Sequence, residues 1–240
     1  MIKDKPVKKM FLPLPIIINI TVAATLWAAR PLSTDDAGTV EKEKFETEIS
    51  FDHCQSRPEG TCQSPAFFIK HGLTDRLDFG LGFSHSTDKD ADGNTVGWGM
   101  SPLEIGFKMA LLKENQTMPD ISLSAGYETG GTEYGLNMIF SRGYGNLGLH
   151  VNLGYDSPGE AMAKGSVGSA LAAEYTLAGK YRLCAEFNAE ALDDGSEVVG
   201  NSGLVGGSLD FGLLIWDAGL RLHDHHGPKA TITSGITAGF

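Results

Sequence analysis

The sequence predicts an all-β fold, a twelve-stranded antiparallel transmembrane β-barrel preceded by a signal peptide. Three observations support this. Short segments with alternating apolar and polar residues recur after residue 40, which is typical of strands with one apolar face. The first residues are basic and lead into an apolar run. No later segment is long and apolar enough for a spanning helix, whereas the strands of a membrane barrel are individually weak signals.

The N-terminal segment has the organisation of a secretory signal. Four lysines fall within the first ten residues, and an apolar run extends to about residue 29. A membrane anchor would need about 20 apolar residues, and Pro13, Pro15 and Asn19 shorten this run. We therefore expect cleavage near Ala28 or Ala29, which makes residues 1–29 a signal peptide and 30–240 the mature chain.

Charge excludes one class of partner. The chain has a formal net charge of −11, and loss of residues 1–29 removes four lysines and one aspartate, leaving −14. Nucleic-acid binding requires clustered lysine and arginine. We therefore expect no nucleic-acid partner.

Alternation marks twelve strands in chain order. In the first, Phe45, Thr47 and Ile49 share one face, opposite Glu46 and Glu48. The same period of two residues predicts the strands that follow. These are 65–71, 77–83, 103–111, 121–127, 134–140, 147–155, 170–177, 181–190, 209–215, 216–222 and 230–240. After the strand 65–71, the apolar faces carry, in chain order, Phe79, Phe107, Leu123, Met138, Val151, Leu171, Phe187, Leu213, Leu220 and Ile236.

The last strand supports the membrane interpretation. Ile232, Ile236 and Phe240 lie on one face, and Thr233 and Thr237 lie on the other. A terminal strand that ends on phenylalanine resembles the last strand of bacterial outer-membrane barrels, which their assembly machinery recognises. We therefore expect Phe240 to contact the barrel-assembly machinery. A terminal strand of a soluble β protein would alternate in the same way.

The polar faces distinguish a membrane barrel from a soluble sandwich or barrel. About eight strands already give an interior filled by side chains or one small ligand, so twelve strands enclose more space than side chains fill. The polar faces also mix glycines with fixed charges, which suits a wet lumen. The predicted lumen residues are Asp78, Glu104, Lys108, His150, Asn152, Glu174, Arg182, Glu186, Asp210, Asp217 and Arg221. These charges either pair across strands or favour cationic over anionic solutes.

The connections should alternate between long extracellular loops and short periplasmic turns. The predicted loops are 53–64, 84–101, 128–133, 156–165, 193–201 and 223–228. The predicted turns are 72–75, 113–119, 143–146, 178–180 and 215–217. The predicted extracellular loops are generally longer and more acidic than the predicted periplasmic turns.

The cysteines fit an exported protein. Cys54 and Cys62 bracket a turn-forming stretch, and in an oxidising compartment they predict a disulfide. Cys184 is left over, and we expect a thiol that is buried or faces lipid.

Metal and catalytic motifs are weak, and no cofactor is predicted. Asp88, Asp90 and Asp92 begin a calcium-loop pattern, but Gly99 stands where an EF-hand needs its bidentate glutamate. The segment 223–226 is a second weak metal candidate. A lipid-modifying hydrolase would need a serine, a base and an acid. No Gly-x-Ser-x-Gly occurs, and His150 has no obvious serine partner.

Six motifs resemble the outer-membrane proteins associated with the meta-cleavage pathway of phenol degradation, a family of transporters. The most specific is RPLSTDDAGTV at 30–40. The others are HGLTDRLDFGLG at 71–82, LEIGFK at 103–108, LSAGYETG at 123–130, LHVNLGY at 149–155 and DAGLR at 217–221. The resemblance implies a twelve-stranded barrel, residues 41–240, whose segment 30–40 folds into the lumen as a plug. The expected plug residues are Arg30, Pro31, Leu32, Ser33, Thr34, Asp35 and Asp36.

We expect Asp35 and Asp36 to pair with lumen cations such as Lys108, Arg182 or Arg221. The alternative is an unattached periplasmic tail. The resemblance also implies uptake of small hydrophobic or aromatic molecules, through the lumen or sideways into lipid, with outer-membrane lipid and lipopolysaccharide as surroundings. A structural or adhesive barrel and a lipid-modifying hydrolase are the alternative functions.

Overall fold

The computed structural model describes residues 30–56, 59–130, 133–159, 163–224 and 228–240. The predicted signal peptide, residues 1–29, lies outside this part of the chain. Among the described residues, no helix is long and apolar enough to cross a membrane.

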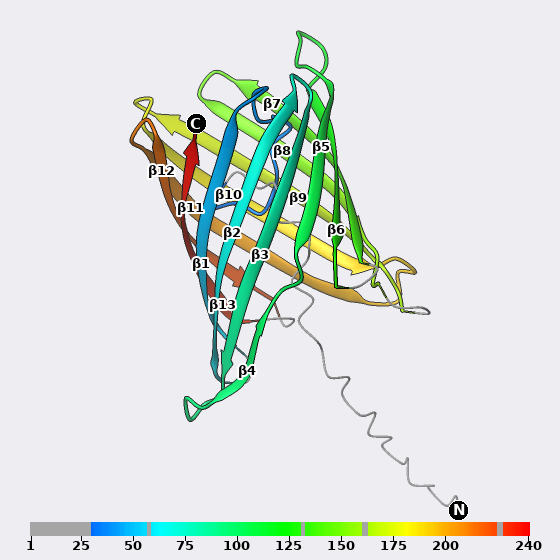
Figure 1. Ribbon diagram of the computed structural model, residues 1–240, viewed down its shortest axis with the longest axis vertical. Helices are drawn as coiled ribbons and strands as arrows, with labels where there is room; N and C mark the ends of the chain where they lie inside the picture. Colours follow the sequence, from blue (N-terminus) through cyan, green and yellow to red (C-terminus); the bar gives the residue numbers. More distant parts are fainter. Residues whose placement is uncertain (1–29, 57–58, 131–132, 160–162, 225–227) are drawn as a thin grey trace, which may run out of the picture.

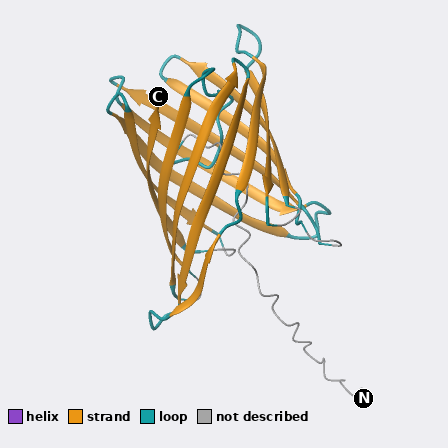
Figure 2. Cartoon of the chain, viewed as in Figure 1, coloured by secondary structure: helices purple, strands orange, loops and turns teal. Residues whose placement is uncertain are grey.

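One antiparallel sheet contains every strand of the described residues and closes on itself (Figures 1 and 2). β1 pairs with β2 on one side and with β13 on the other, so the first and last strands join. Closure pairs the strands of the barrel wall on both sides, as a membrane requires of a β protein. Among the described strands, β4 is the exception, because it pairs on one side with β3 and has no partner on the other. The strands are β1 Phe45–Gln55, β2 Thr61–Thr74, β3 Leu77–Lys89, β4 Thr95–Met100, β5 Glu104–Leu112, β6 Asp120–Glu128, β7 Tyr134–Tyr144, β8 Leu147–Asp156, β9 Ser166–Leu177, β10 Tyr181–Leu192, β11 Val198–Asp210, β12 Leu214–His223 and β13 Ala230–Gly239.

The thirteen labelled strands of the described chain occupy twelve positions around the barrel. β4 and β5 both pair with β3, β4 with its second half and β5 with its first half, so together they form one interrupted strand. The predicted twelve-stranded antiparallel barrel is therefore confirmed.

The strand faces follow the predicted alternation. Ile49, Leu171 and Phe187 point outward and are each more than half exposed, whereas Asp78 and Asp217 point inward and are 1% exposed. A soluble protein would bury the apolar face and expose the charges. The apolar outer surface is therefore the face that contacts lipid, and the polar face encloses the lumen.

The two ends of the barrel differ. The backbone N–H of Phe45 donates to the carbonyl of Phe240 at 2.8 Å, so the beginning and end of the sheet meet at one end. Short turns such as 145–146 and 178–180 close that end, and longer connections such as 90–94 and 193–197 close the other. By the usual asymmetry of bacterial barrels, the first end is periplasmic and the second is extracellular.

One predicted pair of strands is wrong. The sequence suggested strands at 209–215 and 216–222, but β11 ends at Asp210 and β12 begins at Leu214. Gly212 adopts φ 92° between them, and its N–H donates to the Asp210 carboxylate at 2.6 Å, so residues 211–213 form the turn. Asp210 is therefore the last residue of β11, two positions from the inward-facing Ser208, so it lies on the lumen side of the strand and is exposed at its periplasmic end. The glycine-rich sequence of β11 concealed its alternation.

The predicted loop 84–101 is mostly strand. β3 continues to Lys89 and pairs with β4, and only residues 90–94 form the tip of this extended hairpin (Figure 1). The predicted loops 53–64 and 193–201 are also partly strand.

At the tip of the β3–β4 hairpin, the Asp90 carboxylate accepts hydrogen bonds from the backbone N–H groups of Asp92 and Asn94. This weak calcium candidate thus uses an Asp90 oxygen to hold its own turn.

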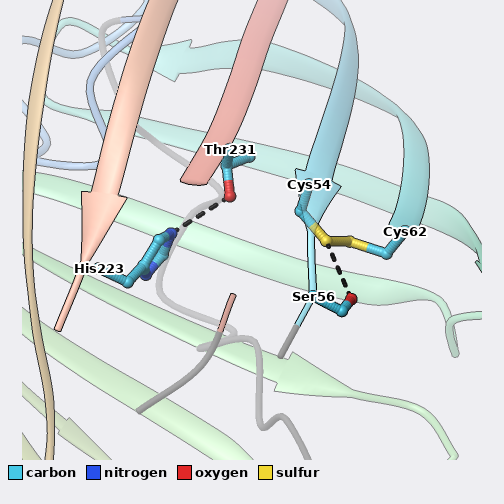
Figure 3. The surroundings of a disulfide bond; sticks show 5 residues. All are labelled: Cys54, Ser56, Cys62, His223 and Thr231. Atoms are coloured by element: carbon cyan, nitrogen blue, oxygen red, sulfur yellow. Dashed lines mark hydrogen bonds between the residues drawn. A yellow bond between two sulfur atoms is a disulfide. The ribbon is translucent and has the colours of Figure 1, made fainter. Parts of the chain in front are cut away.

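The structure joins Cys54 of β1 and Cys62 of β2 in a disulfide near the extracellular end (Figure 3). The two residues are direct partners in the β1–β2 ladder, with their Cα atoms 5.0 Å apart.

Near the disulfide, His223 of β12 makes a 3.2 Å hydrogen bond with the Thr231 hydroxyl. The remainder of the predicted 223–226 metal segment includes residues outside the described part of the chain. No group of three or more His, Cys, Asp or Glu side chains among the described residues is arranged to hold a metal ion.

Candidate functional site: a chain segment inside the lumen

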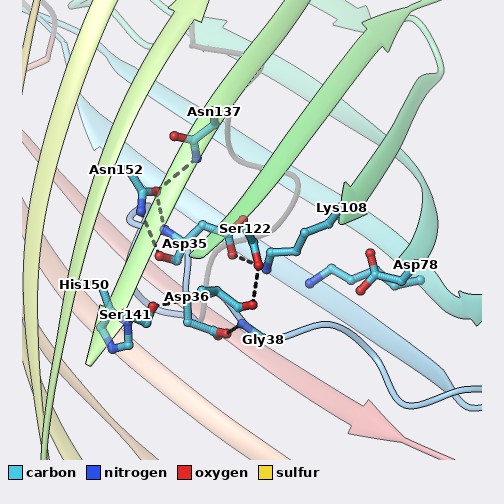
Figure 4. A network of polar contacts seen from close by, with 12 residues as sticks. Asp35, Asp36, Gly38, Asp78, Lys108, Ser122, Asn137, Ser141, His150 and Asn152 are labelled. Atoms are coloured by element: carbon cyan, nitrogen blue, oxygen red, sulfur yellow. Dashed lines mark hydrogen bonds and ion pairs between the residues drawn. The ribbon is translucent and has the colours of Figure 1, made fainter. Parts of the chain in front are cut away.

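Residues 30–40, hereafter the lumen segment, run through the interior of the barrel before β1 begins (Figure 4). Leu32, Thr34, Asp35 and Ala37 are each no more than 3% exposed. The segment forms no regular strand, so its backbone groups need other partners. Side chains of the barrel wall supply many of them.

The wall accepts hydrogen bonds from several backbone N–H groups of the lumen segment. Glu186 of β10 accepts from the N–H groups of both Ser33 and Thr34. Asn152 of β8 accepts from the Asp35 N–H at 2.7 Å. Two further N–H groups bond to the wall. The Ala37 N–H donates to Ser141 of β7, and the Val40 N–H donates to Asp78 of β3.

The wall also donates to the carbonyl groups of the lumen segment. The Asn152 amide donates to the Asp35 carbonyl at 2.9 Å, so one side chain binds both backbone groups of this residue. Ser122 of β6 donates to the Ala37 carbonyl at 2.6 Å. Arg182 of β10 donates to the Arg30 carbonyl at 3.1 Å. These paired contacts fix the path of the backbone and do not depend on its side chains.

Two ion pairs connect the lumen segment to the wall. Lys108 of β5 lies 2.9 Å from the Asp35 carboxylate, with both side chains almost fully buried. Arg30 lies 3.4 Å from the carboxylate of Asp217 on β12. Burial raises the pKa of Asp35, and Lys108 opposes that shift. Lys108 is therefore the group that favours an ionised Asp35 inside the barrel.

Asp36 has a hydrogen-bond partner within the segment and also lies in the favourable field of Lys108. Its carboxylate accepts a hydrogen bond from the Gly38 N–H within the segment at 2.6 Å. The other two expected cations bind elsewhere. Arg221 pairs with Glu186 at 2.8 Å and donates to the Ser33 hydroxyl, and Arg182 pairs with Glu174 at 3.2 Å. Glu186 thus connects the lumen segment, the wall and Arg221.

Glycines of the wall make room for the first residues of the segment. A Cβ atom built on Gly219 of β12 would lie 3.3 Å from the Pro31 side chain. One built on Gly235 of β13 would lie 2.4 Å from the Arg30 side chain. The absence of a side chain therefore permits the approach at Gly235 and relieves a tight contact at Gly219.

A small apolar cluster stands among these polar contacts. Leu32 of the segment packs with Ala172, Cys184 and Leu204, which point inward from β9, β10 and β11. Cys184 is therefore a buried thiol that faces the lumen and not lipid. The inward-facing Leu204 was missed because the sequence predicted no strand at its position.

The surroundings of His150 differ from the sequence-based expectation that it has no serine partner. The sequence offered it no serine partner, but Ser141 on the neighbouring strand lies 2.8 Å from its Nδ1 atom. Its Nε2 atom lies 3.6 Å from the Glu174 carboxylate. A serine, a histidine and an acid are the residue types of a hydrolase triad. Here, however, the serine oxygen also accepts the Ala37 N–H at 2.8 Å, so it holds the lumen segment.

Several contacting residues were not singled out from the sequence. Lys70 of β2 is buried and pairs with Glu46 and Glu48 of β1. Its position in the period-2 pattern of β2 could have revealed its inward direction. Ser122, Asn137, Ser141, Asn188 and Thr233 are also inward-facing polar residues. Uncharged polar residues of this kind carry no signal beyond their position on the strand.

The comparisons with known proteins bear on the fold. No protein-family model and no curated protein sequence matches the chain. Among solved structures, the fold is similar to the COG4313 outer membrane channel from Pseudomonas putida F1, with a TM-score of 0.61, 12% identity, and coverage of 85% of this chain and 98% of that one. It is also similar to the NanC porin, with a TM-score of 0.59, 9% identity, and coverage of 81% and 98%. The KdgM porin in complex with disordered oligogalacturonate gives a TM-score of 0.53, 12% identity, and coverage of 80% and 99%.

Identities this low show a shared fold and no more. The shared fold is that of outer-membrane barrels, and it agrees with a closed sheet whose outer surface is apolar and whose lumen is charged. The protein is therefore a β-barrel of the Gram-negative outer membrane.

Proposed function

We propose that the protein is an outer-membrane channel for uptake of small molecules and that the lumen segment is its plug. The observation that carries the proposal is the placement of residues 30–40 inside a closed barrel, held by hydrogen bonds and ion pairs to strands on several sides. A segment in this position occupies space that a solute would need. Its anchors are polar contacts, which water can replace when the segment leaves.

The expected solutes are small hydrophobic or aromatic molecules. This expectation comes from the resemblance of motifs such as RPLSTDDAGTV to proteins associated with the phenol meta-cleavage pathway. Inward-facing apolar groups support it in part, because Ile139 and Leu204 lie on the lumen face with at most 2% exposure. Leu204 packs against Leu32 of the lumen segment, so it would become available to an apolar solute when the segment leaves.

The test is uptake by liposomes that contain the purified protein. Radiolabelled phenol crosses bilayers unaided, so the assay should use phenyl β-glucoside, whose sugar suppresses passive permeation. We expect protein-containing liposomes to take it up faster than protein-free liposomes, and faster again after deletion of residues 30–38. Equal rates in all three preparations would rule out the channel. Release of fatty acid from phospholipid in the same vesicles would instead support the hydrolase.

A further inference from the structure

Three carboxylates lie at the extracellular ends of neighbouring strands and face the lumen. Glu104 is the first residue of β5, Glu128 is the last of β6, and Asp156 is the last of β8. We call this set the acidic arc. It lies on the side from which an external solute would arrive.

Strand register fixes the spacing of the acidic arc. Glu104 and Glu128 are direct partners across the β5–β6 ladder. Asp156 is the direct partner of Gly135 on β7, which in turn is the partner of Gly126 on β6. Adjacent strands lie about 4.8 Å apart, so the acidic arc extends over about 14 Å of the wall from β5 to β8.

The acidic arc contains carboxylate oxygens that the protein does not satisfy. Glu104 is 8% exposed, and its Oε1 atom is buried without a hydrogen bond. The Oδ1 atom of Asp156 is also buried without a hydrogen bond. A buried carboxylate needs a proton or a cation to neutralise it, especially beside other acids.

The lumen cations of the described chain form their closest ion pairs with other acids. Lys108 pairs with Asp35, and Arg182 pairs with Glu174. Arg221 likewise pairs with Glu186. Besides protonation, a positive charge from outside the protein would therefore complete the acidic arc.

A row of glycines lies directly beside the acidic arc. Gly80, Gly106, Gly126 and Gly135 are successive partners across β3, β5, β6 and β7, and the row continues to Asp156 on β8. All four face the lumen, because each is an even number of residues from an inward-facing residue of its strand. A glycine inside a strand often marks a place where another group approaches the backbone. On the opposite wall, glycines receive the lumen segment in this way.

We propose that the acidic arc and the glycine row form a binding site for an aromatic organic cation. The carboxylates bind its ammonium group, and the flat ring lies against the backbone of Gly106 and Gly126, since the Asp156 carboxylate already lies over Gly135. A single metal ion requires ligands within about 2.6 Å of one point, whereas the acidic arc spreads its charges over about 14 Å. This spacing suits a solute that moves from one carboxylate to the next, as cations move past acidic rings in channels. The inference rests on the proposed channel function.

The test compares two rigid probes of opposite permanent charge. Phenyltrimethylammonium, benzenesulfonate and the neutral sugar arabinose are given to liposomes that contain the variant lacking residues 30–38. We expect the cation to enter at least about tenfold faster than the anion, because the Coulomb attraction between its fixed charge and nearby carboxylates exceeds the free energy that corresponds to a factor of ten. In the triple variant E104Q/E128Q/D156N of the same protein, the two rates should become equal while arabinose uptake is unchanged.

The matched control is E59Q/D92N/E197Q, which removes three exposed acids from extracellular loops. It should retain the preference for the cation. The single variant E104Q, measured in parallel, should reduce the preference at least about threefold, since it removes the Coulomb attraction of the carboxylate that is 8% exposed. Equal uptake of both ions by the parent, or a preference that survives the triple variant, would refute the site while arabinose uptake still supports the channel. Absence of arabinose uptake would refute the channel itself.

Discussion

Replacing Asp35 by asparagine tests how strongly the lumen segment is held. The change removes the negative partner of Lys108 without altering the shape of the side chain. The two groups lie 2.9 Å apart, with side-chain exposures of 0% and 4%. Removing one partner of a buried ion pair leaves the other charge without compensation and costs about 3–5 kcal/mol. We expect the segment to lose docking free energy of this order.

A loss of this size changes the docked population strongly. Each 1.36 kcal/mol is a factor of ten, so the ratio of docked to undocked segment should fall roughly a hundredfold to several thousandfold. The double variant D35N/K108M should recover most of the loss, because it removes the stranded ammonium as well. Replacement of a buried ion pair by groups of similar volume is often close to neutral.

The assay is single-channel recording in planar bilayers, where undocking appears as time spent in a high-conductance state. The control is K164M, which breaks the exposed pair between Lys164 and Asp194, whose side chains are 48% and 44% exposed. Exposed pairs contribute about 0–1 kcal/mol, so the control should resemble the unmodified protein. The reasoning fails if D35N opens no more often than the control, or if the double variant opens more often than D35N.

Three further variants test other parts of the structure. Gly219→Ala places a methyl group 3.3 Å from the lumen segment and should raise the fraction of time that the channel is open. The control Gly203→Ala, whose methyl group has its nearest contact at 3.7 Å, should not. Equal open fractions would argue against a role of Gly219 in making room for the segment. Glu186→Ala leaves Arg221 and two backbone N–H groups without their partner. We therefore expect more frequent opening and a free energy of unfolding in guanidinium that is lower by about 3–5 kcal/mol. An unchanged unfolding midpoint would contradict this. The variant C54S/C62S opens a short covalent loop and should lower unfolding free energy by roughly 2–3 kcal/mol without changing conductance; a changed conductance would mean that the disulfide also shapes the lumen.

Much of the barrel follows from period-2 alternation. Outward Phe107 and inward Lys108 could be assigned from the sequence because β5 alternates large apolar residues with small or charged ones. The faces of β11 could not be assigned in this way, because Gly203, Gly206 and Gly207 weaken the contrast between them. The sequence-based strand was consequently placed too late, across the turn at Gly212. Alternation locates strands only where both faces carry distinctive side chains.

The lumen contacts were harder to predict than the strands. Asp35 was expected to pair with a lumen cation, and the structure places Lys108 beside it. Which cation it meets depends on the path of a segment that has no periodicity. Contacts such as that of Asn152 with the Asp35 backbone join residues 117 positions apart. Sequence alone contains no measure of such distances, and it gave no reason to prefer Asn152 over other inward polar residues.

The central claim is that residues 30–40 obstruct a water-filled lumen. Its most direct test is the single-channel conductance of a variant lacking residues 30–38, measured beside the full mature chain in the same bilayer and salt. The account predicts a higher conductance for the shortened protein, with the apolar outer surface and barrel fold retained. Identical conductance in a correctly folded variant would contradict the assignment of this segment as a plug.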